Sequence, residues 1–146
     1  PRRRLTPAMA GLGLLVLLMI SLAISQFVET SGPPIAWETD LTAALARAEQ
    51  SRRRVFLYLH GAACEYTPRY ERTLFLQRSV RNRLAEMVPC RLEVKAGDAA
   101  ARRYGFTNDP VMVVLDANGL PLTQPLVGGH IEDKQFLTYI QSGIDR

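Results

Sequence analysis

The fold is decided by the stretch VFLYLHGAACEYTPRYERTLF, residues 55–75. It opens with a compact apolar run, Val55–Leu59, which is rich in strand formers and is ended by His60-Gly61. Such a run is typical of a strand buried on both faces, as in a parallel sheet. The residues from Pro68 to Ala85 then predict a helix, with a break near residues 77–79. The stretch therefore predicts a strand, a loop containing Cys64, and a helix.

The rest of the chain extends this unit in both directions. Ahead of it, Thr39 or Asp40 is a plausible N-cap for a helix whose apolar positions are Trp37, Leu41, Ala44, Leu45 and Ala48. After it we expect strands at 88–94 and 111–115, a short helix at 99–104, a turn at 116–119, an antiparallel strand at 122–127 and a helix at 134–144. A βαβ unit followed by a ββα unit indicates an α/β fold with a central mixed sheet and helices on both faces.

Three stretches carry a family resemblance: residues 55–75, quoted above, SVRNRLAEMVPCRLEV at 79–94, and YGFTNDPVMVVLDANG at 104–119. In them the chain resembles the thioredoxin superfamily, and more narrowly its bacterial envelope branch, which includes the C-terminal domains of transmembrane thiol-reductant carriers. The resemblance runs from Trp37 to Ile144 and implies a thioredoxin-like fold. It also implies that Pro110 is a cis-proline facing the active-site loop.

The chain departs from this family at the position that carries its chemistry. Cys64 stands where the first active-site cysteine belongs, but Thr67 occupies the second position and Ala63 replaces the usual aromatic residue. A dithiol oxidoreductase needs both sulfurs, because the second resolves the mixed disulfide formed by the first. Cys90 is the other thiol, and roughly four strand residues at about 3.3 Å each put it beyond disulfide reach of Cys64. We therefore expect Cys90 to be a small core residue.

Cys64 itself has two interpretations. In one it is a monothiol nucleophile at a helix N-terminus, with Thr67 donating a hydrogen bond, Arg69 favouring the thiolate and Glu65 opposing it. In the other, which we favour, Cys64 is a vestige in a loop that no longer does chemistry.

The histidines do not add a catalytic or metal site. His60 can pair with Cys64 as a general base, but a strand-terminal histidine with a satisfied hydrogen bond is the commoner arrangement. His130 follows two glycines in a loop and is expected to be solvated. Two histidines and two cysteines dispersed in this way lack zinc-ligand spacing. No nucleotide fingerprint is present, so we expect no metal and no cofactor.

The N-terminal part predicts a membrane anchor. Residues 5–28 contain no charged side chain, Arg2–Arg4 precede them and Glu29 follows. Such a run is long enough to cross a bilayer, and the positive-inside rule places the N-terminus in the cytoplasm. A signal peptide cleaved near Ala23-Ile24-Ser25 is the alternative. We expect an arginine cluster and transmembrane anchor at 1–28, a linker at 29–36 and a thioredoxin-like domain at 37–146, on the periplasmic side of a bacterial inner membrane.

The charge distribution argues against a nucleic-acid partner but permits an acidic protein or a lipid surface. The formal net charge is +4, but 15 basic and 14 acidic residues follow Val28, so the domain is nearly neutral and lacks a nucleic-acid-binding motif. Nine arginines nevertheless lie between Arg47 and Arg83, against Glu49, Glu65 and Glu71. They can face lipid phosphates or an acidic partner, or form a solvated surface.

The function that fits these features best is not enzymatic. An anchored domain without a resolving cysteine suits an accessory or scaffold subunit of a larger respiratory, photosynthetic or secretion complex. Its partners would be other membrane subunits and lipids, with a docking groove beside Cys64, Thr67 and Pro110. The alternatives are a tethered monothiol oxidoreductase that uses Cys64, and a periplasmic assembly factor or holdase.

Overall fold

The computed structural model describes Met19 and residues 32–146. The chain divides into two units, Pro1–Ser31 and Gly32–Arg146, and the description below concerns the second. Among the described residues, no helix is both long and apolar enough to span a bilayer. The arginine cluster, nearly all of the predicted anchor and the first three linker residues lie outside the described part, so the anchor stays a prediction.

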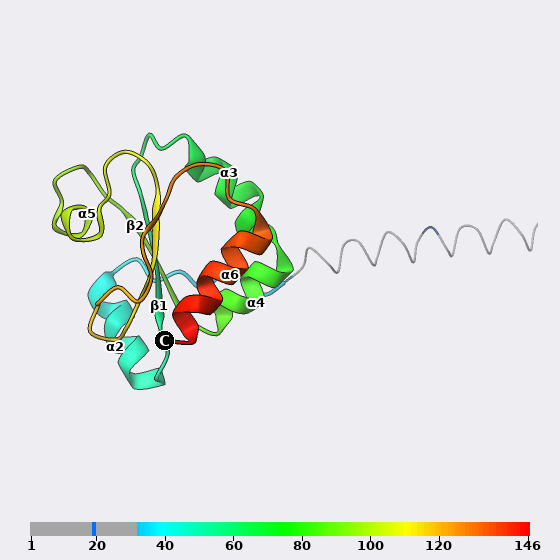
Figure 1. Ribbon diagram of the computed structural model, residues 1–146, viewed down its shortest axis with the longest axis horizontal. Coiled ribbons are helices and arrows are strands. Elements are labelled where there is room, and N and C mark those ends of the chain that lie inside the picture. Colours follow the sequence, from blue (N-terminus) through cyan, green and yellow to red (C-terminus); the bar gives the residue numbers. More distant parts are fainter. Residues whose placement is uncertain (1–18, 20–31) are drawn as a thin grey trace, which may run out of the picture. The chain divides into compact units, whose positions relative to one another are not determined.

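A four-stranded mixed sheet forms the centre of the domain (Figure 1). Strand β1 (Val55–His60) pairs in parallel with β2 (Val88–Glu93) and antiparallel with β3 (Val111–Leu115), and β4 (Leu126–Val127) pairs antiparallel with β3. The order across the sheet is β2-β1-β3-β4. All six residues of β1 are buried, which confirms the prediction that this apolar run is a strand buried on both faces.

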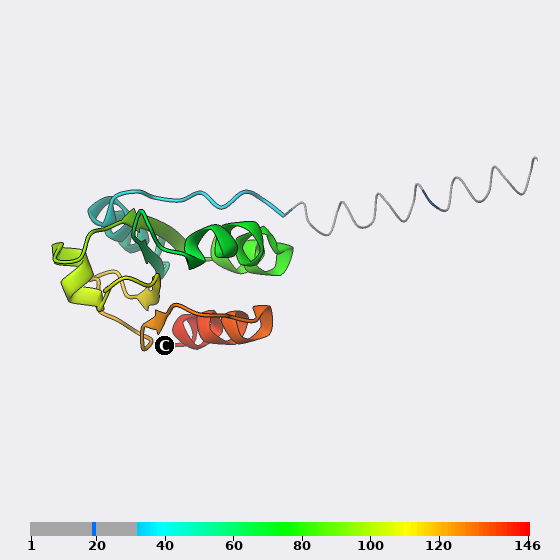
Figure 2. The ribbon, with the colours of Figure 1, turned by 90° about the horizontal axis from the view of Figure 1, so that it is seen from above.

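Helices cover both faces of the sheet, as the element order predicts (Figure 2). One face is covered by α2 (Leu41–Ser51) and α5 (Ala99–Tyr104). The other is covered by α3 (Tyr66–Arg72), the 3₁₀ turn η1 (Leu74–Leu76), α4 (Arg78–Ala85) and α6 (Asp133–Ile144). This is the α/β arrangement that the sequence predicts, with a central mixed sheet and helices on both faces.

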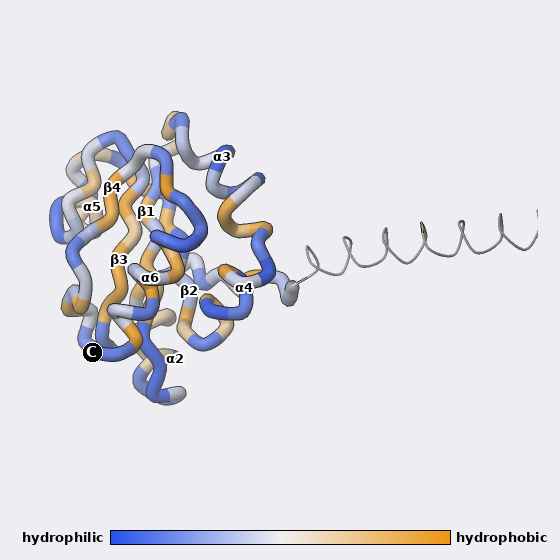
Figure 3. The backbone as a smooth tube through the Cα atoms, turned by 45° about the vertical axis from the view of Figure 1, so that its right-hand side comes forward, coloured by the Kyte–Doolittle hydropathy of each residue, from blue (hydrophilic) through white to orange (hydrophobic). Residues whose placement is uncertain are grey.

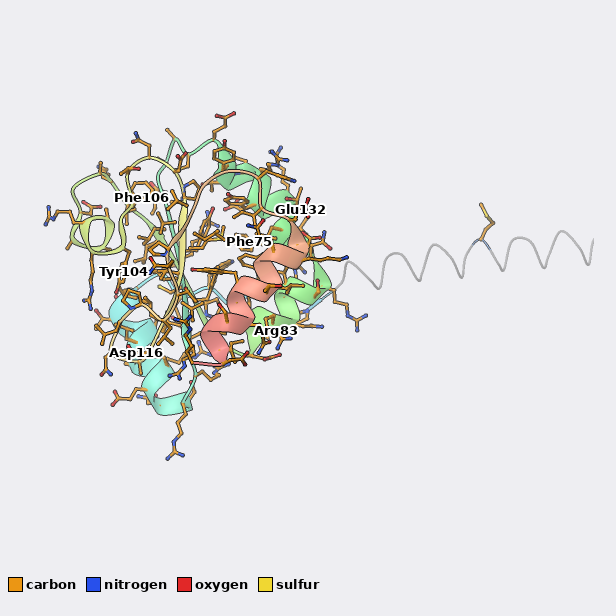
Figure 4. The ribbon with its side chains drawn as sticks, in the orientation of Figure 1. Phe75, Arg83, Tyr104, Phe106, Asp116 and Glu132 are labelled. Carbon is orange, nitrogen blue, oxygen red and sulfur yellow. The ribbon has the colours of Figure 1, made fainter. Side chains whose placement is uncertain are left out.

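Alternating residues of β1 divide the core into two halves, as expected for a strand buried on both faces. Leu57 belongs to the half beneath α2 and α5, together with Cys90 and Tyr104. Phe56 belongs to the half beneath α3, α4 and α6, where its ring meets that of Phe136 edge-on at 5.7 Å. Figure 4 shows Phe75 in this second half and Tyr104 on the opposite side of the sheet, and Figure 3 shows the hydrophobic strands between the two layers.

The first helix of the domain begins later than its apolar spacing predicts. Asp40 is the N-cap, since its carboxylate accepts from the backbone N–H of Thr42 at 2.9 Å. Placing Trp37 on this helix is wrong. Glu38 instead makes a parallel bridge to Cys90, and Trp37 packs in the other half of the core, with its ring 5.2 Å from that of Phe75. Extended backbone at Glu38 therefore directs Trp37 across the sheet edge.

Two other local predictions can be compared with the structure. The predicted break in the helix from Pro68 to Ala85 is confirmed, because Gln77 is extended between η1 and α4. The strand predicted at 122–127 is wrong in extent, since only Leu126–Val127 forms β4. Pro121 and Pro125 have no N–H to donate to a ladder, and the Thr123 hydroxyl takes the Val114 N–H at 3.1 Å instead.

Candidate functional site

Cys64 lies between the end of β1 and the start of α3, where it is 9% exposed. Its backbone N–H donates to the carbonyl of Gly61 at 3.2 Å, which closes a tight turn. The Sγ atom donates to the carbonyl oxygen of Asn108 at 2.7 Å and accepts from the Gly61 N–H at 3.1 Å. Only a protonated thiol can donate, and a thiolate this close to a carbonyl oxygen would be repelled. The sulfur is therefore occupied by two backbone groups, and its bond to Asn108 must break before it can act as a nucleophile.

Thr67 occupies the second active-site position, but its side chain does not serve Cys64. Its hydroxyl is buried without a hydrogen bond of good geometry, beside the hydroxyl of Tyr58. Burial raises the pKa of Tyr58 to about 12, and the neighbouring Thr67 hydroxyl partly offsets this increase. The hydrogen bond from Thr67 to Cys64, which belongs to the monothiol interpretation, is absent: the Thr67 hydroxyl has no partner within the described domain, and the sulfur contacts Gly61 and Asn108.

Pro110 lies near Cys64 in the fold, but not in the conformation that the family resemblance implies. The structure has no cis peptide bond among the described residues, so a cis-proline at 110 is wrong. The trans form is the ordinary one for a proline peptide. Hydrogen bonds hold the backbone at and before Pro110. The Pro110 carbonyl accepts from the Gly128 N–H at 2.8 Å, and the Asn108 carbonyl accepts from Cys64 Sγ.

A solvent-facing bend at residues 107–109 lies beside this sulfur. Asn108 and Asp109 are exposed, and within residues 32–146 their N–H groups have no backbone partner. The edge strand β4 ends next to them. Gly128 has a φ of +46°, and a Cβ there would come within 2.8 Å of the Asp109 Cβ, so only glycine permits this close approach. Free amides next to a sheet edge can pair with an extended peptide.

A chain of polar side chains runs beneath the loop on the α3 side of the sheet. The Arg91 Nε donates to His60 Nε2 at 2.9 Å, and the Arg91 Nη2 pairs with Glu71 Oε1 at 2.6 Å. Burial and the neighbouring Arg91 charge lower the pKa of His60, which is 5% exposed. His60 is thus a strand-terminal histidine with a satisfied hydrogen bond, as expected. Its Nε2 lone pair is committed to Arg91 and is not available to Cys64 as a base.

Cys90 is confirmed as a core residue. It is fully buried in β2 opposite Leu57, and both cysteines are free thiols. Burial raises the pKa of Cys90 to about 12, with smaller contributions from Glu38 and Asp40. A thiol of this kind neither attacks nor resolves a disulfide at neutral pH.

The burial of Cys90 gives a stability prediction. Cys90→Ser places a hydroxyl in the apolar core without a partner, and we expect it to lower the free energy of unfolding by about 1–3 kcal/mol. Cys64→Ser is the matched control, because Asn108 and Gly61 can serve its hydroxyl as they serve the thiol. Urea unfolding followed by the fluorescence of Trp37, the single tryptophan, measures both. Equal losses in the two variants would contradict this interpretation of Cys90.

The arginines and His130 discussed in the sequence analysis lie away from Cys64. Arg69 interacts with the exposed His130, with its Nη2 2.9 Å from Nδ1, instead of facing the thiol. Arg52–Arg54, which belong to the arginine-rich stretch 47–83, precede β1 at the end of the sheet opposite the loop. Within residues 32–146 no group of three or more His, Cys, Asp or Glu side chains could hold a metal ion.

The sequence did not predict the two backbone groups that contact Cys64. The Asn108 carbonyl and the Gly61 N–H carry no side-chain signature, and both depend on how two distant loops meet. Tyr58 and Arg91 had a signal that was not used: each interrupts a strand otherwise rich in apolar residues, and they are paired in register. A polar side chain in such a strand needs a partner on the same face of the sheet.

Comparison with known proteins places this geometry in context. A family model described as thioredoxin-like matches residues 36–117. A curated relative, the thiol:disulfide interchange protein DsbD of Actinobacillus pleuropneumoniae serotype 5b (strain L20), is 27% identical over 92 residues, which are 60% of this chain and 16% of the relative. The chain therefore spans only a small part of that protein.

Solved structures agree on the fold. A putative disulphide-isomerase from Bacteroides thetaiotaomicron matches with a TM-score of 0.65 at 19% identity, covering 79% of this chain and 97% of that one. The oxidised C-terminal domain of DsbD from Neisseria meningitidis matches with a TM-score of 0.62 at 20% identity, covering 74% and 99%. At these identities the likeness concerns the fold alone.

Proposed function

Since the chain belongs to the thioredoxin-like family yet holds a single thiol, hydrogen-bonded to the Asn108 carbonyl, at the family's reactive position, we propose that it is a non-catalytic accessory subunit of a larger membrane complex. In this proposal residues 5–28 anchor the chain in a bacterial inner membrane and the domain lies on the periplasmic side. The observation that carries the proposal is the hydrogen bond from Cys64 Sγ to the Asn108 carbonyl, in a site where Thr67 replaces the second sulfur.

We infer the mode of interaction from the backbone beside Cys64, and we propose the exposed surface around it as the docking surface. The free N–H groups of Asn108 and Asp109 can pair with an extended segment of a partner subunit. Val127, at the edge of the sheet, is 50% exposed and offers the apolar contact that such a segment needs. We call Asn108, Asp109 and Val127 the docking surface. Membrane complexes of respiratory, photosynthetic or secretion type are the candidates for the assembly.

Native mass spectrometry of the chain, extracted in mild detergent from its own membrane, tests this proposal. We expect association with other membrane subunits at fixed stoichiometry. Val127→Arg should weaken the association, because it replaces the apolar contact of the docking surface with a charge. Leu120→Arg is the matched control, because Leu120 is an apolar residue of similar exposure, 56%, beyond the other end of β3. A free monomer would contradict a subunit role, and substoichiometric clients would point to an assembly factor or holdase.

A second candidate function rests on one contact. The Gly61 N–H points at Cys64 Sγ at 3.1 Å, and a donor in this position stabilises a thiolate if one forms. A tethered monothiol oxidoreductase would use this arrangement. It requires the thiol to give up its bond to Asn108, and Cys64→Ser would then abolish thiol transfer by the full chain.

A further inference from the structure

The segment from Arg72 to Arg78 combines two buried apolar residues with five exposed ones. Leu74 and Phe75 are 2% and 5% exposed and fix η1 in the core. The other five residues are exposed to solvent, and Leu76 among them is 44% exposed. We call this exposed set the η1 surface: Arg72, Thr73, Leu76, Gln77 and Arg78. Figure 3 shows the apolar stretch of η1 passing directly into the hydrophilic helix α4.

The charge of this region is not balanced by its neighbours. Between Tyr66 and Ala85 the chain carries five arginines and one acidic residue, Glu71, which is already paired with Arg91. Within the described residues, neither Arg72 nor Arg78 makes an ion pair or a side-chain hydrogen bond. The two arginines that flank the exposed Leu76 in the sequence are therefore exposed and have no partner within residues 32–146.

The η1 surface lies where the polypeptide enters the domain. Arg81 donates from Nη1 to the Gly32 carbonyl at 3.1 Å and from Nε to the Phe75 carbonyl at 2.8 Å, so it ties the entry point to η1. A Cβ at Gly32 would lie 3.2 Å from the Cα of Arg78. The residues that follow Gly32 run along the α3–α4 layer in Figure 2. Beside them is a cleft of about 280 Å³, whose lining includes Pro34, Ile35 and Leu76.

We propose that the η1 surface docks on the phosphate head groups of anionic phospholipids. The inference rests on the proposed membrane anchor: only Glu29, Thr30 and Ser31 separate the apolar run from Gly32, and each spans at most about 3.5 Å. Arginines tied to the entry point then lie close to the head groups. Guanidinium groups bind phosphates in a bidentate manner, and Leu76 can enter the apolar boundary between them. This short tether favours a lipid surface over an acidic protein.

The test places the full chain in nanodiscs of phosphatidylcholine, with or without phosphatidylglycerol. A fluorophore on Ser79→Cys in a Cys64→Ser background reports on α4, next to Arg78. The same fluorophore on Asn118→Cys reports on the exposed turn after β3. Lipids spin-labelled in the head group act as quenchers. We expect several-fold stronger quenching at position 79 than at 118 when phosphatidylglycerol is present, and a decrease with added salt.

Two double variants distinguish the effect of the η1 surface from the effect of the domain's net charge. Arg72→Gln/Arg78→Gln should weaken the docking equilibrium by about thirtyfold, because each arginine near an anionic surface contributes to binding. The control Lys95→Gln/Arg102→Gln removes the same charge near α5 and should leave the quenching unchanged. Thermal unfolding of both variants confirms that they are folded.

The possible outcomes distinguish a failure of the lipid-docking proposal from a failure of the proposed membrane anchor. If the chain does not enter the nanodiscs at all, the anchored subunit itself is contradicted. If it enters but positions 79 and 118 are quenched alike, or both variants lose quenching equally, the anchor stands and lipid docking is overturned. Protection of position 79 that requires a copurified acidic subunit, and not phosphatidylglycerol, also overturns it.

Discussion

Replacing Thr67 with cysteine is expected to create a redox-active pair in a chain that otherwise has none. The Thr67 N–H donates to the Cys64 carbonyl at 3.3 Å, so the two residues lie one helical turn apart. Side chains at this spacing are about 5–6 Å apart at Cβ and can approach within disulfide range after a small adjustment. The new thiol also takes the place of a buried hydroxyl that has no partner.

The expected result for Thr67→Cys is the loss of two hydrogens on mild oxidation, detected by mass spectrometry of the intact chain, and a gain of disulfide reductase activity over wild type. Ser79→Cys is the matched control, since it adds a thiol at an exposed position of α4 outside this turn. If Thr67→Cys stays reduced under conditions that oxidise an ordinary C-x-x-C pair, the loop geometry, and not only the missing sulfur, prevents dithiol chemistry.

The second large effect concerns alkaline pH. Burial raises the pKa of Cys90 from 9.0 to about 12, and the pKa values of Tyr58 and Tyr70 from 10.0 to about 12. The folded chain keeps these protons while the unfolded chain loses them. Stability is therefore fully present below pH 9 and falls as the pH rises toward 12. Together the three groups should lower the free energy of unfolding by about 5 kcal/mol at pH 11, a large part of a small domain's stability.

Cys90 accounts for about half of this loss, because its shift is the largest of the three. The comparison that checks it is urea unfolding of wild type and Cys90→Ala between pH 8 and pH 11, at pH intervals of about one unit, followed by Trp37 fluorescence. The alanine variant should be less stable at pH 8 but lose only about half as much stability by pH 11. Parallel curves for the two proteins would mean that the Cys90 thiol titrates normally in the fold.

Much of the fold could be predicted because local pattern and burial agree. The apolar run of β1 is buried on both faces, Gly105 ends α5 in a left-handed conformation, and the break at Gln77 separates η1 from α4. The prediction failed where a single residue depends on tertiary contacts. Trp37 has helical spacing, but the bridge made by Glu38 decides its direction. Likewise, the extent of β4 depends on prolines and on where the Thr123 hydroxyl finds a donor.

The candidate site was predictable in its parts and not in its geometry. The missing second sulfur and the core position of Cys90 follow from residue identity and strand spacing. The bond from Cys64 to Asn108 could not be foreseen, because its acceptor is a backbone carbonyl 44 residues away. The same is true of Thr67, which turns toward Tyr58, and of Pro110, where family resemblance implied a peptide conformation that this backbone does not adopt.

The proposal of a non-catalytic domain depends most directly on the reactivity of Cys64 in the wild-type chain. The measurement is the rate at which the full chain exchanges thiol with a glutathione mixed disulfide at neutral pH, compared with Cys64→Ser. We predict equal rates at the level of the uncatalysed reaction, because Sγ is 9% exposed and donates to Asn108. A wild-type rate well above that of Cys64→Ser would contradict the proposal and establish Cys64 as a working monothiol.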